Sequence, residues 1–304
     1  MTARVKTIDA ARGKWRGILL TLGISEKFLS GKHGPCPICG GTDRARWDNK
    51  GGSGSYLCSQ CGSGTGMQLL QRVKGWDFAT AAGEVDKVLG NVSDDPPSKP
   101  ALAPDKRKAL LRELWTGGRR LEPCDPAHDY LTRARRLSLA GVDLSDLRFH
   151  PGAKVPDNLG GGVAPALLAL VRNAAGNPAS IHRTFLDGKG WHKGRAMFAG
   201  DLPDAIAIRL GAPVDGVLGI AEGLETALAV RDQFGVTCWS TVSAGYLAKF
   251  EPPEGVERVL VFGDADESYT GQAAAFASAK RLVSKGYSVA VKIPPELGLD
   301  FADG

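Results

Sequence analysis

Short apolar runs alternate with segments of helical periodicity in the last third of this 304-residue chain. The runs lack polar alternation, which is typical of strands buried on both faces of a parallel sheet. They cover residues 217–223, 236–242, 259–266 and 289–293. Helical spacing is found between them, in residues 224–234, 244–250 and 273–282. This alternation predicts an open, doubly wound, mostly parallel α/β sheet.

Acidic residues lie at the ends of two of these predicted strands. Glu222 lies at the end of the first apolar run, and Asp264 and Asp266 lie at the end of the third. Because such sheets bind ligands beyond the carboxyl ends of their strands, the three side chains should meet in one crevice. Carboxylates that close repel one another unless a divalent cation lies among them, and oxygen ligands suit Mg²⁺ or Mn²⁺. The alternative for any single acid is a solvated loop residue or a helix cap.

The pattern at the amino terminus predicts helices around a small sheet. Residues 7–22 have the periodicity of one amphipathic helix, and two more helices are predicted over residues 67–73 and 76–89. Residues 43–47 and 54–57 are strand-like. We expect the first helix to pack against the module that these strands form, with a phosphate contact by its basic residues as the alternative.

Two pairs of cysteines accompany these short strands. Cys36 and Cys39 form one Cys-x-x-Cys pair, and Cys58 and Cys61 form the other, eighteen residues further on. Pairs at this separation hold one zinc ion in a tetrahedral thiolate shell. A redox pair is the main alternative, but it would explain only one of the two motifs. Four thiolates close the shell, so the predicted zinc is structural.

Basic and aromatic residues lie on the two predicted strands of this zinc ribbon. They are Arg44, Arg46, Trp47 and Tyr56. Guanidinium groups and aromatic faces on one small sheet suit the binding of unpaired bases, which predicts contact with single-stranded nucleic acid. The alternative is that Trp47 and Tyr56 cover the metal core.

The middle of the chain predicts a linker and then an α+β region. Residues 91–104 are rich in proline and indicate an exposed linker. Helices are predicted over residues 106–120 and 129–139, and strands over residues 166–171 and 179–187. Residues 188–195 form a basic, glycine-rich loop without the Gly-Lys-Ser/Thr of a nucleotide-hydrolysing loop. No ATPase is therefore indicated.

Four parts follow from these patterns. We expect a zinc-ribbon domain with helices (1–92), a linker (93–105), a helical and then α+β region (106–210) and a parallel-sheet domain (211–304). The formal charge of +5 is unevenly divided among them. Residues 1–209 hold 31 Lys and Arg against 20 Asp and Glu, whereas residues 210–304 hold 7 against 13. The net positive charge of residues 1–209 favours a polyanionic partner, and the acidic crevice expected in residues 210–304 favours bound cations.

No signal peptide or membrane-spanning run is recognisable in the sequence. No apolar stretch reaches 18 residues, and the amino terminus is basic and amphipathic. Four of the six cysteines lie in close pairs, which favours metal binding in a reducing compartment over disulfides. We therefore expect a cytoplasmic protein with no membrane partner.

Two segments resemble a known family. Glu222-Gly223 with Glu225-Thr226-Ala227-Leu228, the segment 263–266 and the segment 299–303 resemble the Toprim domain, a Rossmann-like fold, in the form found in primases of plasmids, phages and mobile elements. Residues 34–37, the second cysteine pair and residues 75–78 resemble the zinc-binding domain of the same primases. The two resemblances occur in the family's order and together cover nearly all of residues 1–92 and 165–303.

The resemblance implies a DNA primase that makes short RNA primers on single-stranded DNA from ribonucleoside triphosphates during replication of a mobile element. It implies catalysis assisted by Mg²⁺ or Mn²⁺ held by Glu222, Asp264 and Asp266, with Asp300, and also Asp303, as further acidic residues. In similar primases a basic strand and loop precede the Toprim unit. The matching candidates for binding nucleotide or template phosphate are Arg183, Lys189, Lys193 and Arg195.

Other functions remain open at this point. A Toprim nuclease would use the same acids with water as the nucleophile. A non-enzymatic loading subunit that binds single-stranded DNA is a second alternative, which the intact acidic motifs disfavour. A topoisomerase would need a separate large domain with a nucleophilic tyrosine. The segment after Asp266 departs from the commonest family pattern, and both a stand-alone primase and one that works with a replicative helicase, fused or separate, fit the sequence.

Overall fold

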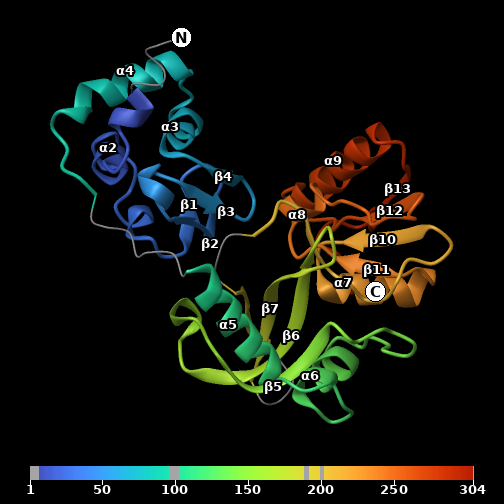
Figure 1. Cartoon of the computed structure of the whole chain (residues 1–304). Coiled ribbons are helices and arrows are strands. Elements are labelled where there is room, and N and C mark those ends of the chain that lie inside the picture. The colour runs from blue at the N-terminus through green and yellow to red at the C-terminus, as the bar shows by residue number, and fades with distance from the viewer. Residues whose placement is uncertain (1–6, 96–102, 188–191, 199–201, 304) are drawn as a thin grey trace. The chain divides into compact units, whose positions relative to one another are not determined.

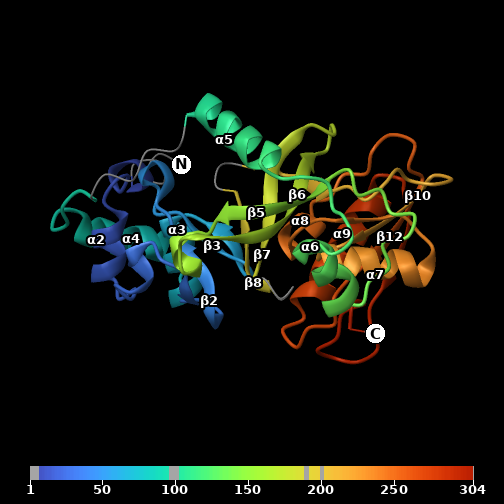
Figure 2. The same ribbon diagram turned by 90° about the horizontal axis from the view of Figure 1, so that it is seen from below.

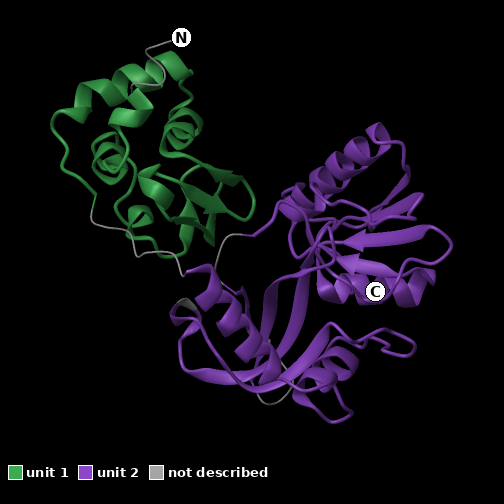
Figure 3. Ribbon diagram, viewed as in Figure 1, with its two compact units in different colours: residues 1–101 green, residues 102–304 purple. Residues whose placement is uncertain are grey.

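The computed structural model describes residues 7–95, 103–187, 192–198 and 202–303, apart from the side chains of Asn158, His192 and Lys193. The chain divides into two compact units, Met1–Ala101 and Leu102–Gly304 (Figure 3). Among the described residues, no helix has the length and apolar character needed to cross a bilayer.

Unit 1 combines helices with a small antiparallel sheet, which in its described residues has four strands in the order β1-β2-β3-β4 (Figure 1). The strands are β1 (Gly34–Cys36), β2 (Gly40–Trp47), β3 (Tyr56–Cys58) and β4 (Gly62–Gly64). The helices are α2 (Trp15–Thr21), α3 (Gly66–Lys74) and α4 (Phe78–Leu89). The predicted zinc ribbon is therefore confirmed, and so are the helices predicted over residues 67–73 and 76–89.

The single helix predicted over residues 7–22 is wrong. Residues 7–10 are helical, and a turn that includes Gly13 separates them from α2. Gly13 has a φ of +75°, which a right-handed helix cannot accommodate. The apolar periodicity was nevertheless informative about packing, since Trp15 and Ile18 are buried in the core of unit 1.

Close packing holds α3 against α2, the helix that begins at Trp15. A Cβ placed on Gly66 would lie only 2.4 Å from the ring of Trp15, so this approach requires glycine. Thr65 then caps α3, because its hydroxyl accepts the backbone N–H of Gln68 while the Gln68 side chain accepts the N–H of Thr65. The helix ends at Gly75, whose φ is +68°.

Unit 2 is built on one continuous sheet, which has nine strands in the described residues. The order is β13-β12-β10-β11-β9-β6-β7-β8, and β5 pairs with β6. The antiparallel part contains β5 (Leu147–Lys154), β6 (Val163–Asn173), β7 (Pro178–Leu186), β8 (His192–Met197) and β9 (Ile206–Ile208). The parallel part contains β10 (Val217–Ala221), β11 (Cys238–Ser240), β12 (Arg258–Phe262) and β13 (Ser288–Lys292).

Helices cover both faces of the parallel part, as predicted for a doubly wound sheet (Figure 1). Residues of α7 (Leu224–Phe234) pack into one core on one face. Residues of α8 (Ala244–Leu247) and α9 (Thr270–Ser284) pack into a separate core on the other. Sheet strands buried under both layers explain why the apolar runs showed no alternation.

The antiparallel part carries two helices of its own. The apolar side of α5 (Pro104–Thr116) packs on β6 and β7, beside which it lies in Figure 2. The second helix, α6 (Pro126–Asp129), continues into one π-helical turn, Tyr130–Ala134. The helix predicted over residues 129–139 is therefore too long, because regular helical structure stops before Arg135. The next residue, Arg136, has a φ of +55°.

Three further strands differ from the sequence-based expectation. The basic loop predicted over residues 188–195 becomes strand from His192 onward, while residues 188–191 lie outside the described part. The strands β5 and β9 were not anticipated. Strand β9 is important for the architecture, because its antiparallel pairs with β6 and β11 join the two parts into one sheet.

Candidate metal centres and active site

The four cysteines meet at one point of unit 1. Cys36 and Cys58 end strands β1 and β3, and Cys39 and Cys61 lie in the turns that follow. The Sγ atoms of Cys36 and Cys61 are 3.9 Å apart, and those of Cys39 and Cys58 are 3.8 Å apart. All four sulfur atoms lie within 4.8 Å of one another. The two predicted pairs therefore form a single cluster.

The cluster fits a structural zinc ion. Tetrahedral coordination with ordinary zinc–sulfur bonds places the sulfur atoms about 3.8 Å apart, close to the two distances of 3.9 Å and 3.8 Å given above. Backbone N–H groups of Ile38 and Cys61 point at the sulfurs of Cys36 and Cys58, at 3.4 Å and 3.3 Å. Burial, with hydrogen bonding and charge from the other cysteines, raises the pKa of the Cys61 thiol. A bound dication would relieve that crowding of thiolates.

The structure separates the four residues proposed to bind bases. Because side chains alternate along a strand, Arg44 and Arg46 lie on one face of β2 and Trp47 on the other. Trp47 pairs across the sheet with Tyr56, and both are buried, at 8% and 1% exposure. Tyr56 also accepts a hydrogen bond from Arg72 at 2.9 Å. The two rings thus cover the metal core, and the two half-exposed arginines face the other way.

The Toprim-like acids converge at the carboxyl ends of neighbouring parallel strands in unit 2. Ala221 of β10 pairs with Phe262 of β12, so Glu222 and the segment containing Asp264 leave the sheet side by side. Burial, and next the charge of Asp264, raises the pKa of Glu222 to about 7. Burial, and next the charge of Asp300, raises the pKa of Asp264 to about 6. The electrostatic coupling places these three carboxylates near one another.

The carboxyl-terminal segment lies alongside Asp264. Backbone hydrogen bonds join Ala265 to Leu299 at 3.0 Å and Gly298 to Ala265 at 2.6 Å. They bring Asp300 and Asp303 toward the end of β12, where both raise the pKa of Asp264. The last acidic motif therefore belongs to the same cluster, although it follows Asp266 by more than thirty residues.

One carboxylate oxygen in this cluster has an unmet bonding requirement. Oδ1 of Asp264 is buried and has no hydrogen-bond partner among the described residues. A buried, unpaired carboxylate oxygen is costly, and a divalent cation would satisfy it. In the described residues, only the cysteines bring three or more ligand atoms within 4.8 Å of one another. The acids thus fit Mg²⁺ or Mn²⁺ by chemistry and charge, in a looser arrangement.

Asp266 has a different environment from its neighbours. Its Oδ1 accepts hydrogen bonds from the Ser268 hydroxyl at 2.5 Å and from the N–H of Thr270 at 3.1 Å. Its Oδ2 accepts the N–H of Gly271 at 2.7 Å. Although burial raises it, these hydrogen bonds leave the pKa of Asp266 below its ordinary value. This carboxylate anchors the start of α9 and stays ionised beside the cluster.

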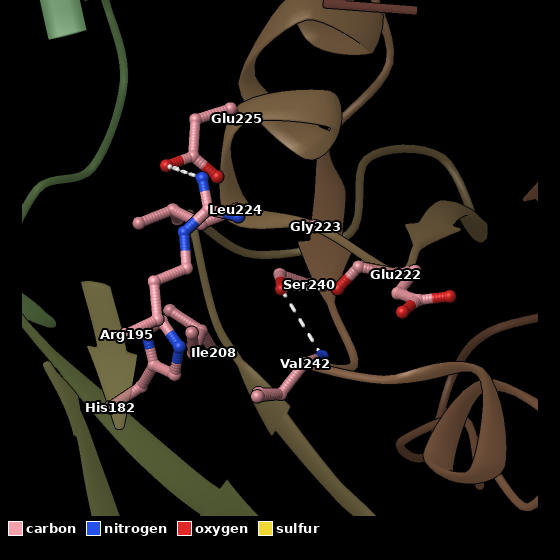
Figure 4. A pocket seen from close by; sticks show the side chains of 9 residues that line it. All are labelled: His182, Arg195, Ile208, Glu222, Gly223, Leu224, Glu225, Ser240 and Val242. Atoms are coloured by element: carbon pink, nitrogen blue, oxygen red, sulfur yellow. Dashed lines mark hydrogen bonds and ion pairs between the residues drawn. The ribbon is translucent and has the colours of Figure 1, made fainter. Parts of the chain in front are cut away.

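A small pocket adjoins Glu222 at the turn that joins β10 to α7. Side chains of His182, Arg195, Glu225 and Ser240 contribute to its walls (Figure 4). The cavity is about 40 Å³, far below the roughly 300 Å³ of a small-molecule site. It suits ordered water rather than a nucleotide. Polar side chains of the antiparallel strands and of the Toprim-like part nevertheless meet in its walls.

The candidate phosphate ligands differ in their surroundings. Arg183 of β7 is only 8% exposed, and its guanidinium donates to the carbonyls of Lys154 at 2.9 Å and Met197 at 3.5 Å. Arg195 of β8 is partly exposed and forms an ion pair with Glu225 at 2.9 Å. Lys189 lies outside the described residues, as does the side chain of Lys193. In the structure, Arg195 therefore contacts Glu225, whereas Arg183 points toward carbonyl groups of the protein.

Sequence reasoning did not single out three residues at this site. Tyr130 donates to Glu225 at 2.8 Å, and Arg135 lies 4.0 Å from Asp303. Glu225 was noted only as part of a motif. No local pattern reveals such partners, because Tyr130 and Glu225 are 95 residues apart. The one available signal was the placement of Glu225 three residues after Glu222, at the start of a helix.

Comparisons with known protein families agree with this architecture. Residues 31–67 match the zinc-binding domain of primase-helicase, and residues 217–304 match the Toprim domain. Residues 105–199 match a domain of unknown function, DUF7146. The chain is thus a zinc-ribbon and Toprim protein. Its zinc ribbon is similar to the zinc-binding domain of primase-helicase.

Solved primases show a more distant likeness. A DNA primase domain from Pseudomonas aeruginosa is 14% identical, with 65% of this chain and 73% of that chain covered and a TM-score of 0.41. The Aquifex aeolicus primase, comprising zinc-binding and RNA polymerase domains, is 15% identical, with 98% and 81% covered and a TM-score of 0.39.

Proposed function

We propose that this chain is a DNA primase that synthesises short RNA primers on single-stranded DNA. The observation that carries the proposal is the convergence of Glu222, Asp264 and Asp300 around a buried Asp264 oxygen that has no hydrogen-bond partner in the described part of the chain. The same chain has a zinc ribbon similar to that of primase-helicase. The resemblance of the motifs to those of plasmid, phage and mobile-element primases supports replication of a mobile element as the setting.

The reaction is nucleotidyl transfer. A primer 3′-hydroxyl attacks the α-phosphate of a ribonucleoside triphosphate, a new phosphodiester bond forms, and pyrophosphate leaves with the electron pair of the broken bond. Glu222, Asp264 and Asp266 are the residues that hold Mg²⁺ or Mn²⁺, with Asp300 beside them. When bound, such ions neutralise charge on the phosphates and on the departing pyrophosphate.

The chain's own residues prepare this site in two ways. Mutual repulsion among half-buried carboxylates gives the cluster a high affinity for cations, because binding removes both the repulsion and the desolvation cost. The hydrogen bonds at Asp266 keep one acid ionised regardless of its neighbours. The basic candidates Arg183, Lys189, Lys193 and Arg195 are proposed to hold nucleotide or template phosphates.

The proposed macromolecular partners follow from the same reaction. Single-stranded DNA is the template, and the exposed face of β2 with Arg44 and Arg46 is the proposed contact in unit 1. A replicative helicase, fused or separate, is a further proposed partner.

Primer synthesis in vitro tests the proposal. Purified protein, single-stranded DNA of varied sequence, labelled ribonucleotides and Mg²⁺ or Mn²⁺ should yield short, template-dependent RNA. Asp264→Asn should lower the rate of synthesis by roughly a thousandfold, whereas Asp232→Asn, which changes an exposed acid on α7, should leave it unchanged. Metal-dependent shortening of the template instead of synthesis would identify a nuclease. Binding to single-stranded DNA without either activity would identify a loading subunit.

A further inference from the structure

The turn that joins β10 to α7 contains two acids, Glu222 and Glu225, whose side chains point in opposite directions. We call residues 222–225 the acidic turn. Figure 4 shows the Glu222 carboxylate pointing away from Arg195 and Glu225 pointing toward Arg195. Only Gly223 and Leu224 separate them. Glu222 belongs to the proposed metal site, whereas Glu225 is buried, at 4% exposure, and faces the region matched by DUF7146. Whatever fixes Glu225 therefore also fixes the turn that presents Glu222.

Two residues from that region hold Glu225. The Tyr130 hydroxyl donates to Oε1 of Glu225 at 2.8 Å, and Arg195 donates to the same oxygen at 2.9 Å. Arg195 also donates to the Tyr130 oxygen at 3.3 Å, which closes the triangle. Although burial raises it, Arg195 and then Tyr130 bring the pKa of Glu225 below its ordinary value. Glu225 is thus an ionised, compensated group in the protein interior.

The other side of the turn is held by the Toprim part itself. The Ser240 hydroxyl donates to the carbonyl of Glu222 at 2.8 Å, and the N–H of Thr241 donates to the carbonyl of Ala221 at 2.8 Å. The N–H of Ala244 hydrogen-bonds the Glu222 carboxylate. These contacts position the backbone before Gly223. The triangle around Glu225 supplies the fixed point after it, at the first turn of α7.

From this geometry we infer that Tyr130 and Arg195 are positioning residues for the acidic turn: they hold Glu225 on one side and so aim Glu222 at Asp264 on the other. The inference rests on the proposed function, since it assigns Glu222 to metal binding. It also gives the region matched by DUF7146 a role in this chain, which is to support the Toprim site from outside the Toprim domain. Residues behind a metal ligand commonly control its affinity.

A purely structural ion pair is the competing explanation, and the chain contains a matched control. Arg172 and Asp146 form another half-buried pair in unit 2, at 2.6 Å, with Asp146 almost completely buried. This pair joins β6 to the segment before β5. Breaking it should lower stability in the same way as breaking the Arg195–Glu225 pair, without moving the acidic turn.

The test measures binding of Mn²⁺ alone to the full chain, by electron paramagnetic resonance, together with the melting temperature. Tyr130→Phe, Glu225→Gln and Arg195→Met are compared with Asp146→Asn. The first three should weaken Mn²⁺ binding by roughly tenfold, and Asp146→Asn should leave it unchanged at a similar loss of melting temperature. Arg195→Lys, which keeps the charge, should recover part of the affinity lost in Arg195→Met.

The outcomes separate the inference from the proposed function. If the three variants lose melting temperature but bind Mn²⁺ like the wild type, the positioning role is wrong. If Mn²⁺ affinity falls as expected while the wild type makes no primers, the positioning role stands and the primase assignment fails. If the wild type binds no Mn²⁺ at all, both are wrong. In primer synthesis, Tyr130→Phe should raise the metal concentration needed for half-maximal rate and leave the KM for template unchanged.

Discussion

The two candidate metal centres of this chain differ in how completely the protein has formed them. The four sulfurs of the zinc ribbon lie within 4.8 Å of one another, and backbone N–H groups already point at two of them. The Toprim acids are more widely spread and repel one another, and Oδ1 of Asp264 lacks a partner among the described residues. A tight, closed ligand set suits a structural ion, and a loose, electrostatically crowded one suits an ion that must exchange with substrate.

Loss of zinc should give the largest effect, because the cysteines lie within the core of unit 1. Chelation of zinc, or Cys58→Ser, should unfold the ribbon, since zinc binding supplies on the order of 10 kcal/mol to such small domains. Unit 2 has its own cores and should stay folded. Hydrogen exchange followed by mass spectrometry would show loss of protection confined to unit 1. Cys124→Ser, at an exposed cysteine, is the control and should change neither unit.

Removing a Toprim acid should give the opposite result, a large loss of activity with little loss of structure. Asp264→Asn should lower the rate of primer synthesis by roughly a thousandfold, because several kcal/mol of charge stabilisation are lost. The melting temperature without divalent metal should not fall, since the substitution removes a buried charge and its repulsion from Asp300. A fall of many degrees would show that Asp264 is mainly a structural residue.

The same repulsion predicts how the stability of unit 2 depends on pH without metal. The pKa of Glu222 is raised from 4.5 to about 7, and that of Asp264 from 3.8 to about 6. Both groups therefore bind protons more tightly in the folded state, and the stability that protonation contributes is lost as pH rises from about 4 to about 7. Because both side chains are partly exposed, the total loss should be about 2 kcal/mol.

Denaturant unfolding at several pH values, in buffer freed of Mg²⁺ and Mn²⁺ but without a chelator that removes zinc, measures that slope. Glu222→Gln should flatten it, because the amide does not titrate in this range. Added Mg²⁺ should restore stability most at neutral pH, where the carboxylates are ionised and able to bind it. A slope that is the same in the wild type and in Glu222→Gln would contradict the proposed crowding of charges.

The contrast between the two centres also shows what could be predicted from the sequence. The cysteines were recognisable because the spacing within each Cys-x-x-Cys pair is a local feature. Helix α7 was predicted with its observed limits because residues 224–234 have helical spacing between two apolar strand-like runs. The acids Glu222 and Asp264 were recognisable because both end strands of one parallel sheet. These are properties of short segments.

Features that the apolar pattern of a short segment does not reveal were missed or predicted wrongly. Gly13 interrupts the predicted first helix because its φ is positive, and the spacing of apolar residues carries no information about φ. Strand β9 is only three residues long, and it is defined by its partners β6 and β11 rather than by its own pattern. The contact between Tyr130 and Glu225 joins two regions that sequence patterns treat as separate.

The smallest expected effect concerns the zinc ribbon as a binding surface rather than as a metal centre. The arginines of β2 are partly exposed, and the aromatic residues opposite them are buried. Arg44→Ala and Arg46→Ala should therefore weaken binding to single-stranded DNA several-fold with little change in melting temperature. If each arginine contacts one phosphate, the slope of log affinity against log salt should fall by about 0.7 per substitution.

Trp47→Ala should behave differently, because Trp47 is buried in the core of unit 1, which also contains Cys36 and Cys58. We expect a loss of roughly 3 kcal/mol or more in the stability of unit 1, as for other buried tryptophans. Titrations of fluorescent single-stranded DNA at several salt concentrations, with Lys87→Ala on α4 as a control for the loss of one exposed charge, would compare the two faces. Weaker binding by the arginine variants alone would place the nucleic-acid contact on the arginine face of β2. Weaker binding by a folded Trp47→Ala protein, with unchanged binding by the arginine variants, would place it on the aromatic side.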